Sequence, residues 1–332
     1  MEKVRVGFIG CGPMGAGEIM SMATIPQAVV AAAADPVLEK AQPAMEPYGA
    51  PAFADPEQML REVKLDAVVI ASPQFLHREH AELAAGAGVH IFCEKPMATT
   101  TADCEAMIAA AKRGGVKLMI GQVLRYLPIW RTAIELVRSG ELGVPMGVVV
   151  TRIGGGFGSW SQPWRASHQQ SGGILMEINS HEIDFMRCLC GEVESVYCLG
   201  DRFVREDMDS LDNLYLSLRF RQGAAGVLHS SQASFIGESS GKIQCAAGTI
   251  CYRNAHDGSF FDVARQGKKE PERLALANEE DGVRRELREF IEAVANDTPV
   301  TIPGEEGRNN VEVAEAAYLS ARTGAVVKLP LG

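Results

Sequence analysis

The chain has 332 residues, of which 46% are hydrophobic and 22% are charged, a balance typical of a globular protein with ample material for a core. This length favours about two domains. The net charge of −10, with no block of Lys and Arg, argues against nucleic acid or an anionic membrane surface as a partner.

The first predicted element is a strand over residues 4–9, which runs into a glycine-rich turn and then into a helix over residues 16–23. The turn has the spacing G-x-G-x-x-G and consists of Gly10, Cys11, Gly12, Pro13, Met14 and Gly15. In a dinucleotide-binding loop, the first glycine allows the tight turn, the second lets the backbone approach a pyrophosphate, and the third lets the helix pack closely. The N–H groups at the start of the helix then hold the phosphates. The alternative for these glycines is an ordinary turn.

A second apolar run over residues 27–34 predicts the next strand, and it ends at Asp35. Asp35 lies about 20 residues beyond Gly15, where an acidic side chain accepts hydrogen bonds from the adenosine ribose. Because a carboxylate at this place repels a 2′-phosphate, the sequence favours NAD over NADP. The alternative is that Asp35 is a plain turn residue.

The rest of the first third alternates short apolar runs with amphipathic stretches, which indicates βαβ units and a parallel sheet. Predicted strands cover 66–71, 89–93 and 117–121, and predicted helices cover 37–48, 56–62, 77–87 and 101–114. The strands end at Ser72-Pro73, Glu94-Lys95-Pro96 and Gly121-Gln122. We expect these ends at the carboxyl edge of the sheet, where ligands bind. We place this first domain at residues 1–124.

Lys95 is the main candidate for chemistry in this domain. An ammonium group at a strand end can hydrogen-bond a reacting hydroxyl or carbonyl oxygen, stabilise negative charge and pass a proton. The alternative is a surface salt bridge with Glu94. His77 is either a helix cap or a cofactor contact. Gln122 and Arg125 have either a cofactor or hinge role, or a packing role.

The pattern changes after about residue 125, and we assign residues 125–332 to a second domain. A helix over 128–138 is followed by predicted strands with alternating faces over 147–153, 195–199, 213–219, 224–230, 242–246 and 249–252. The alternating faces of these strands and the short segments that connect them indicate a mainly antiparallel sheet. Residues 154–158 are glycine-rich but precede no helix, so we expect a mobile loop. Late helices over 282–296 and 307–321 and a strand over 325–329 complete the chain.

The densest polar cluster of the second domain lies in a predicted helix that follows Gly172-Gly173. Glu177, His181 and Asp184 have i, i+4 and i, i+3 spacings, so we expect all three on one helix face. Three titratable groups on a largely apolar helix favour a functional site, although a solvent-facing network is the alternative. Carboxylate and imidazole are also zinc ligands, but the H-E-x-x-H pattern is absent, so we predict no metal. Arg165, which follows Trp164, is expected either to hold a cofactor or substrate oxygen or to form a structural ion pair.

The eight cysteines are scattered and include no C-x-x-C pair, which predicts neither a zinc knuckle nor a redox motif. We expect buried, reduced thiols and a cytoplasmic protein. The N-terminal residues show no basic-then-apolar leader. No apolar run approaches the roughly 20 residues of a membrane span.

These motifs together resemble the Gfo/Idh/MocA oxidoreductases over nearly the whole chain. The residues that carry the resemblance are the glycine loop, Asp66-Ala67-Val68-Val69-Ile70-Ala71-Ser72-Pro73 with His77, Glu94-Lys95-Pro96, Trp164-Arg165 with Gly172-Gly173, and His181 with Asp184. The family commonly has D-x-x-x-H-x-x-D in the last motif, so Glu177 stands where an aspartate is usual. The resemblance implies a Rossmann domain and a second α/β domain with a large, open, mainly antiparallel sheet, whose face often pairs subunits into dimers or tetramers.

The resemblance also implies an NAD-dependent oxidoreductase that interconverts a secondary alcohol and a ketone on a sugar, sugar derivative or cyclitol. The lysine of the E-K-P motif is catalytic in the family and the histidine transfers a proton, so Lys95, His181 and Asp184 are the expected catalytic residues. The expected cofactor contacts are Gly10, Cys11, Gly12, Pro13, Met14, Gly15, Asp35, Ser72, Pro73, His77, Glu94, Lys95, Gln122 and Arg165. The expected substrate contacts are Lys95, Arg125, Trp164, Glu177, His181 and Asp184.

Three alternatives stay open at this point. One is a hydrolase or lyase that uses tightly bound NAD for transient oxidation, and another is a non-catalytic NAD-binding regulatory protein. A reductase of an unsaturated ring such as biliverdin shares the first domain but gives no reason for the His–Asp stripe.

Overall fold

The computed structural model describes residues 3–155, 162–253, 260–276 and 280–332. Its contacts divide the chain into two compact units, one formed by 1–123 with 280–311 and the other by 124–279 with 312–332. The first break lies one residue from the boundary that the sequence suggests. Residues 280–311 group with the first unit, however, whereas the sequence analysis assigned them to the second domain.

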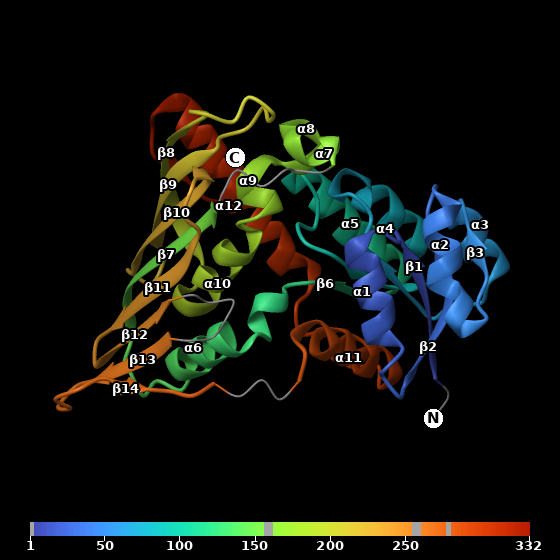
Figure 1. The fold of residues 1–332 in the computed structure, drawn as a ribbon, viewed down its shortest axis with the longest axis horizontal. Helices are drawn as coiled ribbons and strands as arrows, with labels where there is room; N and C mark the ends of the chain where they lie inside the picture. Colours follow the sequence, from blue (N-terminus) through green and yellow to red (C-terminus); the bar gives the residue numbers. More distant parts are fainter. Residues whose placement is uncertain (1–2, 156–161, 254–259, 277–279) are drawn as a thin grey trace. The chain divides into compact units, whose positions relative to one another are not determined.

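The first unit contains a six-stranded parallel sheet with the order β3-β2-β1-β4-β5-β6 (Figure 1). The strands are β1 (Val4–Ile9), β2 (Ala28–Ala34), β3 (Ala52–Phe53), β4 (Ala67–Ile70), β5 (His90–Cys93) and β6 (Leu118–Ile120). The helices are α1 (Pro13–Met22), α2 (Leu38–Met45), α3 (Pro56–Glu62), α4 (His77–Gly86), α5 (Thr101–Gly114) and α11 (Gly282–Ala295). Short 3₁₀ turns are η1 (Glu46–Tyr48) and η2 (Gln74–Leu76).

Helices cover both faces of this sheet, which explains why its strands are mostly apolar. All four residues of β4 are fully buried, as expected of a parallel strand with a helix layer on each side. Helices α4 and α5 pack against each other, and α11 packs against α1, β1 and β5. The Phe92 and Phe290 rings, with centroids 5.7 Å apart, join β5 to α11. This packing places the late segment 280–311 in the first unit.

Two local predictions in this unit need correction. Helix α1 begins at Pro13, directly after the glycine turn, because proline is favourable at the first helical position. The predicted helix over 37–48 is an α-helix only to Met45 and ends in η1, after which Gly49 adopts a left-handed conformation. Strand β3, which has only two residues, was not predicted.

The second unit contains a nine-stranded sheet with the order β14-β13-β12-β11-β7-β10-β9-β8-β15. The strands are β7 (Pro145–Gly155), β8 (Val193–Asp201), β9 (Asn213–Phe220), β10 (Ala225–Ser234), β11 (Glu238–Cys245), β12 (Gly248–Arg253), β13 (Phe260–Arg265), β14 (Glu272–Arg273) and β15 (Val327–Lys328). The helical segments are η3 (Val123–Arg125), α6 (Pro128–Arg138), α7 (Pro163–Ala166), α8 (His168–Ser171), α9 (Gly173–Glu177) and α10 (Ser180–Cys190). Helix α12 (Gly304–Thr323) begins in the first unit and continues in the second.

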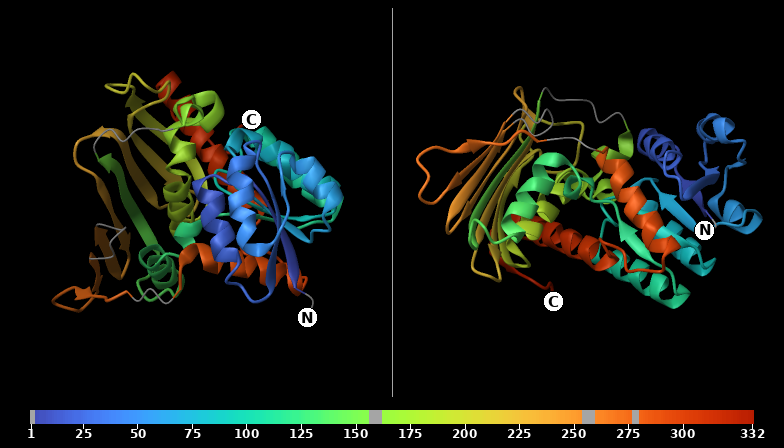
Figure 2. Two further views of the ribbon diagram at one scale, coloured as in Figure 1. Left: turned by 45° about the vertical axis from the view of Figure 1, so that its right-hand side comes forward. Right: turned by 90° about the horizontal axis from the view of Figure 1, so that it is seen from below.

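Every strand pair in this sheet is antiparallel except β7 with β10, so the predicted mainly antiparallel architecture is confirmed. Figures 1 and 2 show α6, α9 and α10 on one face of the sheet. The burial along β9 alternates accordingly, with Leu214, Leu216 and Leu218 buried and Tyr215 exposed between them. Strands β13 and β14 were not predicted. Strand β7 continues to Gly155, so 154–155 are not the expected loop, and 156–158 lie outside the described residues.

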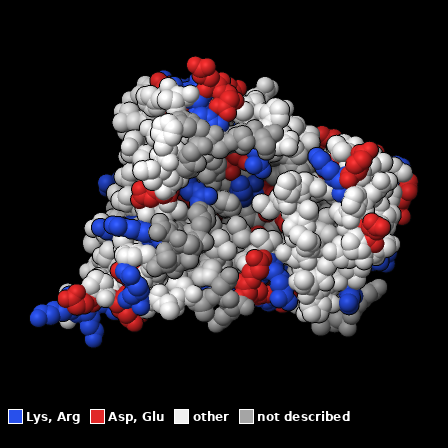
Figure 3. Space-filling view, viewed as in Figure 1, with Lys and Arg blue, Asp and Glu red and all other residues white. Residues whose placement is uncertain are grey.

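Charged side chains of both signs are interspersed on the face of the molecule seen in Figure 3. Among the described residues, Arg–carboxylate pairs include Arg78–Asp103 and Arg265–Glu272, both 2.9 Å. Within the described ranges, no helix has the length and apolarity that a bilayer crossing requires.

Candidate active site

The glycine turn of the first unit is shaped by contacts that exclude side chains at two of its three glycines. Gly10 has φ 99°, and a Cβ there would lie 2.7 Å from the backbone N of Ser72. A Cβ on Gly15 would overlap the backbone O of Gly10. At Gly12, in contrast, a Cβ would meet nothing within 4 Å, so the backbone faces open space. These three environments match the turn, close packing and ligand approach that the G-x-G-x-x-G spacing predicts.

The start of α1 is suited to an anion. Gly12 is the N-cap residue and makes no side-chain capping bond, Pro13 occupies the first turn, and no acidic side chain lies there. The first backbone N–H groups of a helix lack intrahelical acceptors and lie at the positive end of the helix dipole. Pro13 is partly exposed, as is Met14, whose side chain is 48% exposed. This end of α1 can therefore receive a phosphate group.

Asp35 is held against the glycine turn by its own carboxylate. Oδ2 accepts the Cys11 backbone N–H at 2.9 Å, and Oδ1 accepts the Val37 N–H at 2.9 Å. The side chain is buried at the end of β2. Because each carboxylate oxygen has a further lone pair, the group can still accept a hydrogen bond from a ribose hydroxyl. Burial also raises the pKa of the Cys11 thiol to about 12, which keeps this thiol unreactive.

His77 joins two of the three motif-bearing strand ends. Its Nε2 lies 2.8 Å from the carbonyl O of Ser72, and its Nδ1 lies 3.0 Å from the carbonyl O of Pro96. Burial lowers the pKa of His77 to about 4, so the ring is neutral and donates to one carbonyl at a time. The ring thus ties the segment carrying Ser72-Pro73 to the segment carrying Lys95-Pro96. The structure thus gives His77 a positioning contact, and the cofactor contact considered from the sequence stays a prediction.

His80 is a residue of this region that sequence reasoning missed. Its Nδ1 lies 2.9 Å from the Ser72 Oγ, and burial lowers its pKa to about 4. The signal was available, because His77 and His80 are one helical turn apart on α4 and share its buried side.

The Glu94-Lys95 segment leaves β5 at the carboxyl edge of the parallel sheet. Glu94 is buried and its Oε2 accepts the backbone N–H of Lys95 at 3.1 Å, while the Lys95 side chain is partly exposed. Gln122 follows β6 at the same edge and is 1% exposed. The Oε1 atom of Gln122 is buried and has no hydrogen-bond partner among the described residues. The open backbone at Gly12, the start of α1 and the Asp35 carboxylate together fit a dinucleotide.

The helix predicted to carry Glu177, His181 and Asp184 is two helices. Helix α9 ends at Glu177 and α10 begins at Ser180, because Asn179 adopts φ −89° and ψ 3° between them. The Asn179 Nδ2 donates to Glu182 Oε2 at 3.0 Å, and this side-chain bond across the start of α10 offers an alternative to helix continuation. The expectation of one shared helix face is therefore wrong for Glu177, while His181 and Asp184 remain one turn apart on α10.

Asp184 forms a bidentate ion pair with Arg125. The Arg125 Nε donates to Oδ2 at 2.7 Å, and a terminal guanidinium nitrogen donates to Oδ1 at 2.6 Å. The Asp184 side chain is 1% exposed and the Arg125 side chain is 15% exposed. The carboxylate is thus turned into the protein, and the guanidinium is the member of the pair nearer to solvent. Arg125 thus has an ion-pair role, while the cofactor or hinge role considered from the sequence stays a prediction.

Glu177 also has an arginine partner. The Arg165 Nε lies 3.3 Å from Glu177 Oε1, and the Arg165 guanidinium lies 5.2 Å from the Trp164 ring centroid. Glu177 is 9% exposed and Arg165 is 47% exposed, so again the arginine faces solvent. The structure therefore shows the ion pair that was one of the two interpretations of Arg165, and the contact to a cofactor or substrate oxygen stays a prediction. Nearby on α10, Glu182 lies 3.8 Å from Arg152 of β7, a third such pair that sequence reasoning missed.

His181 lies in the first turn of α10 and is half buried, between Glu177 and Asp184 in sequence. The expected site residues thus form two groups: Lys95 and the dinucleotide-binding residues belong to the first unit, and Arg125, Trp164, Arg165, Glu177, His181 and Asp184 belong to the second. No group of three or more His, Cys, Asp or Glu side chains within the described part of the chain is arranged to hold a metal ion.

Comparison with known proteins identifies the class. A family model described as "Oxidoreductase family, NAD-binding Rossmann fold" matches residues 4–122, and one described as "GFO/IDH/MocA C-terminal domain" matches residues 130–251. The chain is 28% identical to the myo-inositol 2-dehydrogenase of Thermotoga maritima over 98% of each chain. It is 28% identical to the 2,7-anhydro-N-acetylneuraminate hydratase of Mediterraneibacter gnavus over 85% of this chain and 75% of that one.

A solved structure of the WlbA dehydrogenase from Bordetella pertussis, in complex with NADH and UDP-GlcNAcA, superimposes with a TM-score of 0.90. That chain is 26% identical, and the match covers 100% of this chain and 99% of the other. The fold class expected from the sequence is therefore confirmed, and so is the oxidoreductase assignment. The chain belongs to the Gfo/Idh/MocA family of oxidoreductases with an NAD-binding Rossmann fold.

Proposed function

We propose that this oxidoreductase interconverts a secondary alcohol and a ketone on a sugar, a sugar derivative or a cyclitol, with Lys95 and His181 as the proton-transfer groups. The similarity to myo-inositol 2-dehydrogenase over almost the whole of both chains supports the substrate class. The observation that carries the proposal is the surroundings of His181, a half-buried imidazole preceded and followed in sequence by carboxylates that arginines hold in place.

The cofactor supplies a nicotinamide ring that accepts or returns a hydride. The backbone at Gly12 and the start of α1 would hold its pyrophosphate, and Asp35 would accept hydrogen bonds from the adenosine ribose. We also propose NAD over NADP, because the Asp35 carboxylate is fixed against the glycine turn and would repel a 2′-phosphate.

His181 would take the proton of the substrate hydroxyl in the oxidising direction and return it to the ketone oxygen in reverse. Lys95 would donate a hydrogen bond to the same oxygen and stabilise its developing negative charge. Asp184, with both oxygens already bonded to Arg125, would position α10 and its arginine instead of abstracting a proton itself. Glu177 would orient Arg165 in the same way, and the two guanidinium groups and Trp164 would contact substrate hydroxyls.

A dehydrogenase screen of sugars and inositols with NAD, read by NADH absorbance, tests the activity. On a substrate so identified, Lys95→Ala and His181→Ala should each lower kcat by more than about 100-fold, which is the usual effect of losing a general acid or base. The affinity for NADH, measured by fluorescence titration, should change little. His229→Ala, on β10 of the second unit, and Lys117→Ala, which removes a surface ion pair with Asp297, are the matched controls. Near-normal turnover in either site variant would remove that residue from the mechanism.

A second candidate is a hydrolase or lyase that oxidises its substrate transiently with retained NAD. The similarity to 2,7-anhydro-N-acetylneuraminate hydratase supports this second candidate. The discriminating measurement is whether NADH accumulates in proportion to product. Stoichiometric NADH supports the dehydrogenase, whereas product without net NADH supports the second candidate. A non-catalytic regulatory role would show cofactor binding without turnover of any polyol.

We further propose a cytoplasmic homodimer or homotetramer. All eight cysteines are free and six of them are buried, as expected of a protein in a reducing compartment. The sheet of the second unit exposes large apolar side chains such as Val149, Leu199 and Tyr215, a feature typical of surfaces that associate. Size-exclusion chromatography with light scattering would give the subunit number.

A further inference from the structure

Ser72 lies where the parallel sheet of the first unit is expected to bind a ligand. The strand order β3-β2-β1-β4-β5-β6 changes direction between β1 and β4, and a dinucleotide binds across the carboxyl ends of the strands at such a point. The glycine turn follows β1, and Ser72 follows β4. A Cβ on Gly10 would lie 2.7 Å from the Ser72 backbone N and 2.8 Å from the Ala71 carbonyl O. Ser72 is therefore a direct neighbour of the turn suited to a pyrophosphate.

The surrounding protein holds both the backbone and the side chain of Ser72. Its carbonyl O lies 2.8 Å from His77 Nε2, and its Oγ lies 2.9 Å from His80 Nδ1. The two histidines share the buried side of α4 and are 1% and 8% exposed, whereas Ser72 is partly exposed. Two buried rings thus fix a residue that can still meet a ligand.

The polar ring of His80 is explained better by its bond to Ser72 than by packing. Burying a polar side chain costs free energy unless a hydrogen bond compensates for it, and a leucine would fill a similar volume without that cost. A hydroxyl can donate to a ring nitrogen or accept from it, so the bond to Ser72 forms in either tautomer of the neutral imidazole. The Ser72 oxygen keeps further hydrogen-bonding capacity after this bond.

We propose that His80 is a positioning residue for the cofactor, because it fixes the Ser72 hydroxyl so that this hydroxyl hydrogen-bonds the nicotinamide half of the dinucleotide. His80 acts through Ser72 and does not itself contact the cofactor. The inference needs the NAD-binding fold, which the family match supplies. It does not depend on the activity proposed above.

The topology of the sheet assigns the contact to one half of the cofactor. A sheet of this order consists of two mononucleotide-binding halves, formed here by β1 to β3 and by β4 to β6. Asp35 follows β2, where a carboxylate accepts hydrogen bonds from the adenosine ribose. Ser72 follows β4 and belongs to the other half. A change at His80 should therefore affect binding of the whole dinucleotide but not of its adenosine half.

The test measures the affinities for NADH and for AMP by isothermal titration calorimetry in variants of His80 and Ser72. His80→Leu removes the hydrogen bond. His80→Asn restores it, because an asparagine amide is separated from Cα by the same number of bonds as the histidine Nδ1. Ser72→Ala removes the hydroxyl, and the double variant Ser72→Ala/His80→Leu shows whether His80 acts through it. His80→Phe, which also lacks a ring nitrogen, takes the place of His80→Leu if that variant does not fold.

His80→Leu should weaken NADH binding about threefold to tenfold, as expected for one hydrogen bond, and His80→Asn should stay within about twofold of the wild type. Ser72→Ala should weaken NADH binding at least as much as His80→Leu. The double variant should bind NADH as Ser72→Ala does. AMP affinity should be unchanged in all of them, because AMP lacks the nicotinamide half.

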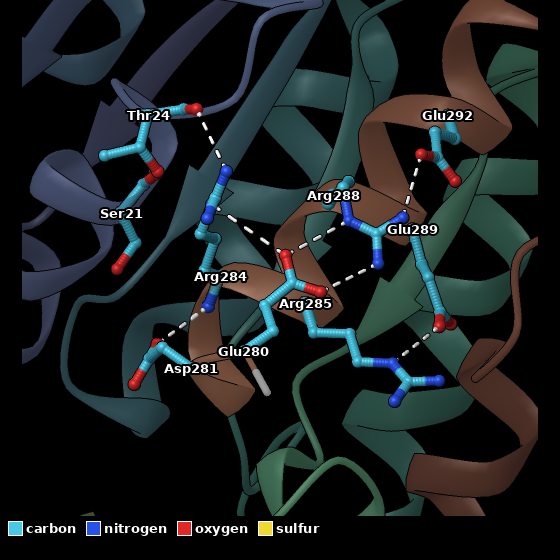
Figure 4. A network of polar contacts seen from close by, with 9 residues as sticks. All are labelled: Ser21, Thr24, Glu280, Asp281, Arg284, Arg285, Arg288, Glu289 and Glu292. Atoms are coloured by element: carbon cyan, nitrogen blue, oxygen red, sulfur yellow. Dashed lines mark hydrogen bonds and ion pairs between the residues drawn. The ribbon is translucent and has the colours of Figure 1, made fainter. Parts of the chain in front are cut away.

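Two control variants change polar contacts of the same unit away from this place. His90 lies at the opposite end of the sheet, at the start of β5, where its Nδ1 accepts the Lys117 backbone N–H at 3.0 Å. Figure 4 shows Arg284 of α11, which donates to the Thr24 carbonyl O at 3.5 Å beyond the far end of α1. His90→Leu and Arg284→Met should both keep the NADH affinity of the wild type.

Three results would overturn the proposal. Unchanged NADH affinity in His80→Leu shows that the ring does not position a cofactor contact. An equal loss of NADH and AMP affinity shows general loosening of the unit instead of a contact to the nicotinamide half. Additive losses in the double variant show that His80 does not act through Ser72. Since these measurements need no turnover, a protein without dehydrogenase activity would refute the proposed function and leave this inference decided.

Discussion

Replacing Arg125 by methionine should destabilise the second unit strongly, because it removes the positive charge that faces the buried Asp184 carboxylate. Both Asp184 oxygens are bonded to the Arg125 guanidinium, at 2.6 and 2.7 Å, and the aspartate side chain is only 1% exposed. Methionine keeps most of the length and apolar surface of the side chain but carries no charge and no donor. The substitution therefore isolates the loss of the ion pair.

Removing one member of a buried ion pair costs about 3–5 kcal/mol, because the remaining charge is desolvated and unpaired. The Arg125 side chain is 15% exposed, so water can reach part of the gap, and we expect the lower end, about 3 kcal/mol. For a protein of this size the urea m value is about 3 kcal/mol per M or more, so the midpoint should fall by up to about 1 M.

Urea unfolding followed by circular dichroism measures the shift of the midpoint. The chain also contains a matched control. Arg273 and Asp262 form another bidentate pair in the second unit, at 2.8 and 3.1 Å, but the arginine is 59% exposed. Arg273→Met should therefore shift the midpoint far less, since exposed pairs contribute little. Adding Asp184→Leu to Arg125→Met should recover much of the loss, because an apolar pair then replaces a buried charge that has lost its counterion. Equal shifts for Arg125→Met and Arg273→Met, or no recovery in the double variant, would refute the reasoning.

Three further outcomes are expected. Burial raises the pKa of Glu18 in the folded protein above its ordinary value of 4.5. Its titration therefore costs no folding stability below about that pH and costs more stability as the pH rises. Glu18→Gln should raise Tm over the wild type by an amount that grows from pH 5 to pH 8, and a pH-independent difference would contradict this. Asp35→Ser should lower the NAD over NADP preference in kcat/KM by about tenfold or more, because it removes like-charge repulsion, and an unchanged preference would exclude Asp35 from cofactor choice. Gly10→Ala should lower Tm and weaken NADH binding in fluorescence titrations, because Gly10 has φ 99° and its Cβ would approach the Ser72 backbone; wild-type binding would show that the turn can adapt.

The first unit was largely predictable because its signals are local. A buried parallel strand such as β4 is apolar along its whole length, so a short apolar run predicts it. The glycine spacing marks the turn, where Gly10 adopts a positive φ that favours glycine. The helix over 101–114 has its N-cap threonine and a left-handed Gly115 at its end, so both bounds follow from capping chemistry. The assignment of 280–311 to this unit was not local. It depends on α11 packing against α1, which residue periodicity cannot reveal.

The helical placement of the candidate residues in the second unit was partly predictable, but their bonding was not. The helical spacing correctly put His181 and Asp184 one turn apart, yet it extended the same helix through Asn179, where a side-chain bond to Glu182 accompanies the break. Arg125 and Asp184 are 59 positions apart in the chain. No spacing rule joins residues at that separation, and only the tertiary fold brings them together.

Buried carboxylates near the candidate site residues of the two units are neutralised by different chemistry, and this difference bears on how the protein responds to pH. In the second unit, Asp184 and Glu177 are each paired with an arginine, whose guanidinium keeps its charge at any pH the protein would meet. In the first unit, Glu18 faces only acidic neighbours, and burial raises its pKa, so its neutrality depends on a bound proton. A rise in pH should therefore disturb the surroundings of Glu18 on α1 while leaving the arginine pairs of α9 and α10 intact. An alkaline loss of stability would accordingly originate in the first unit.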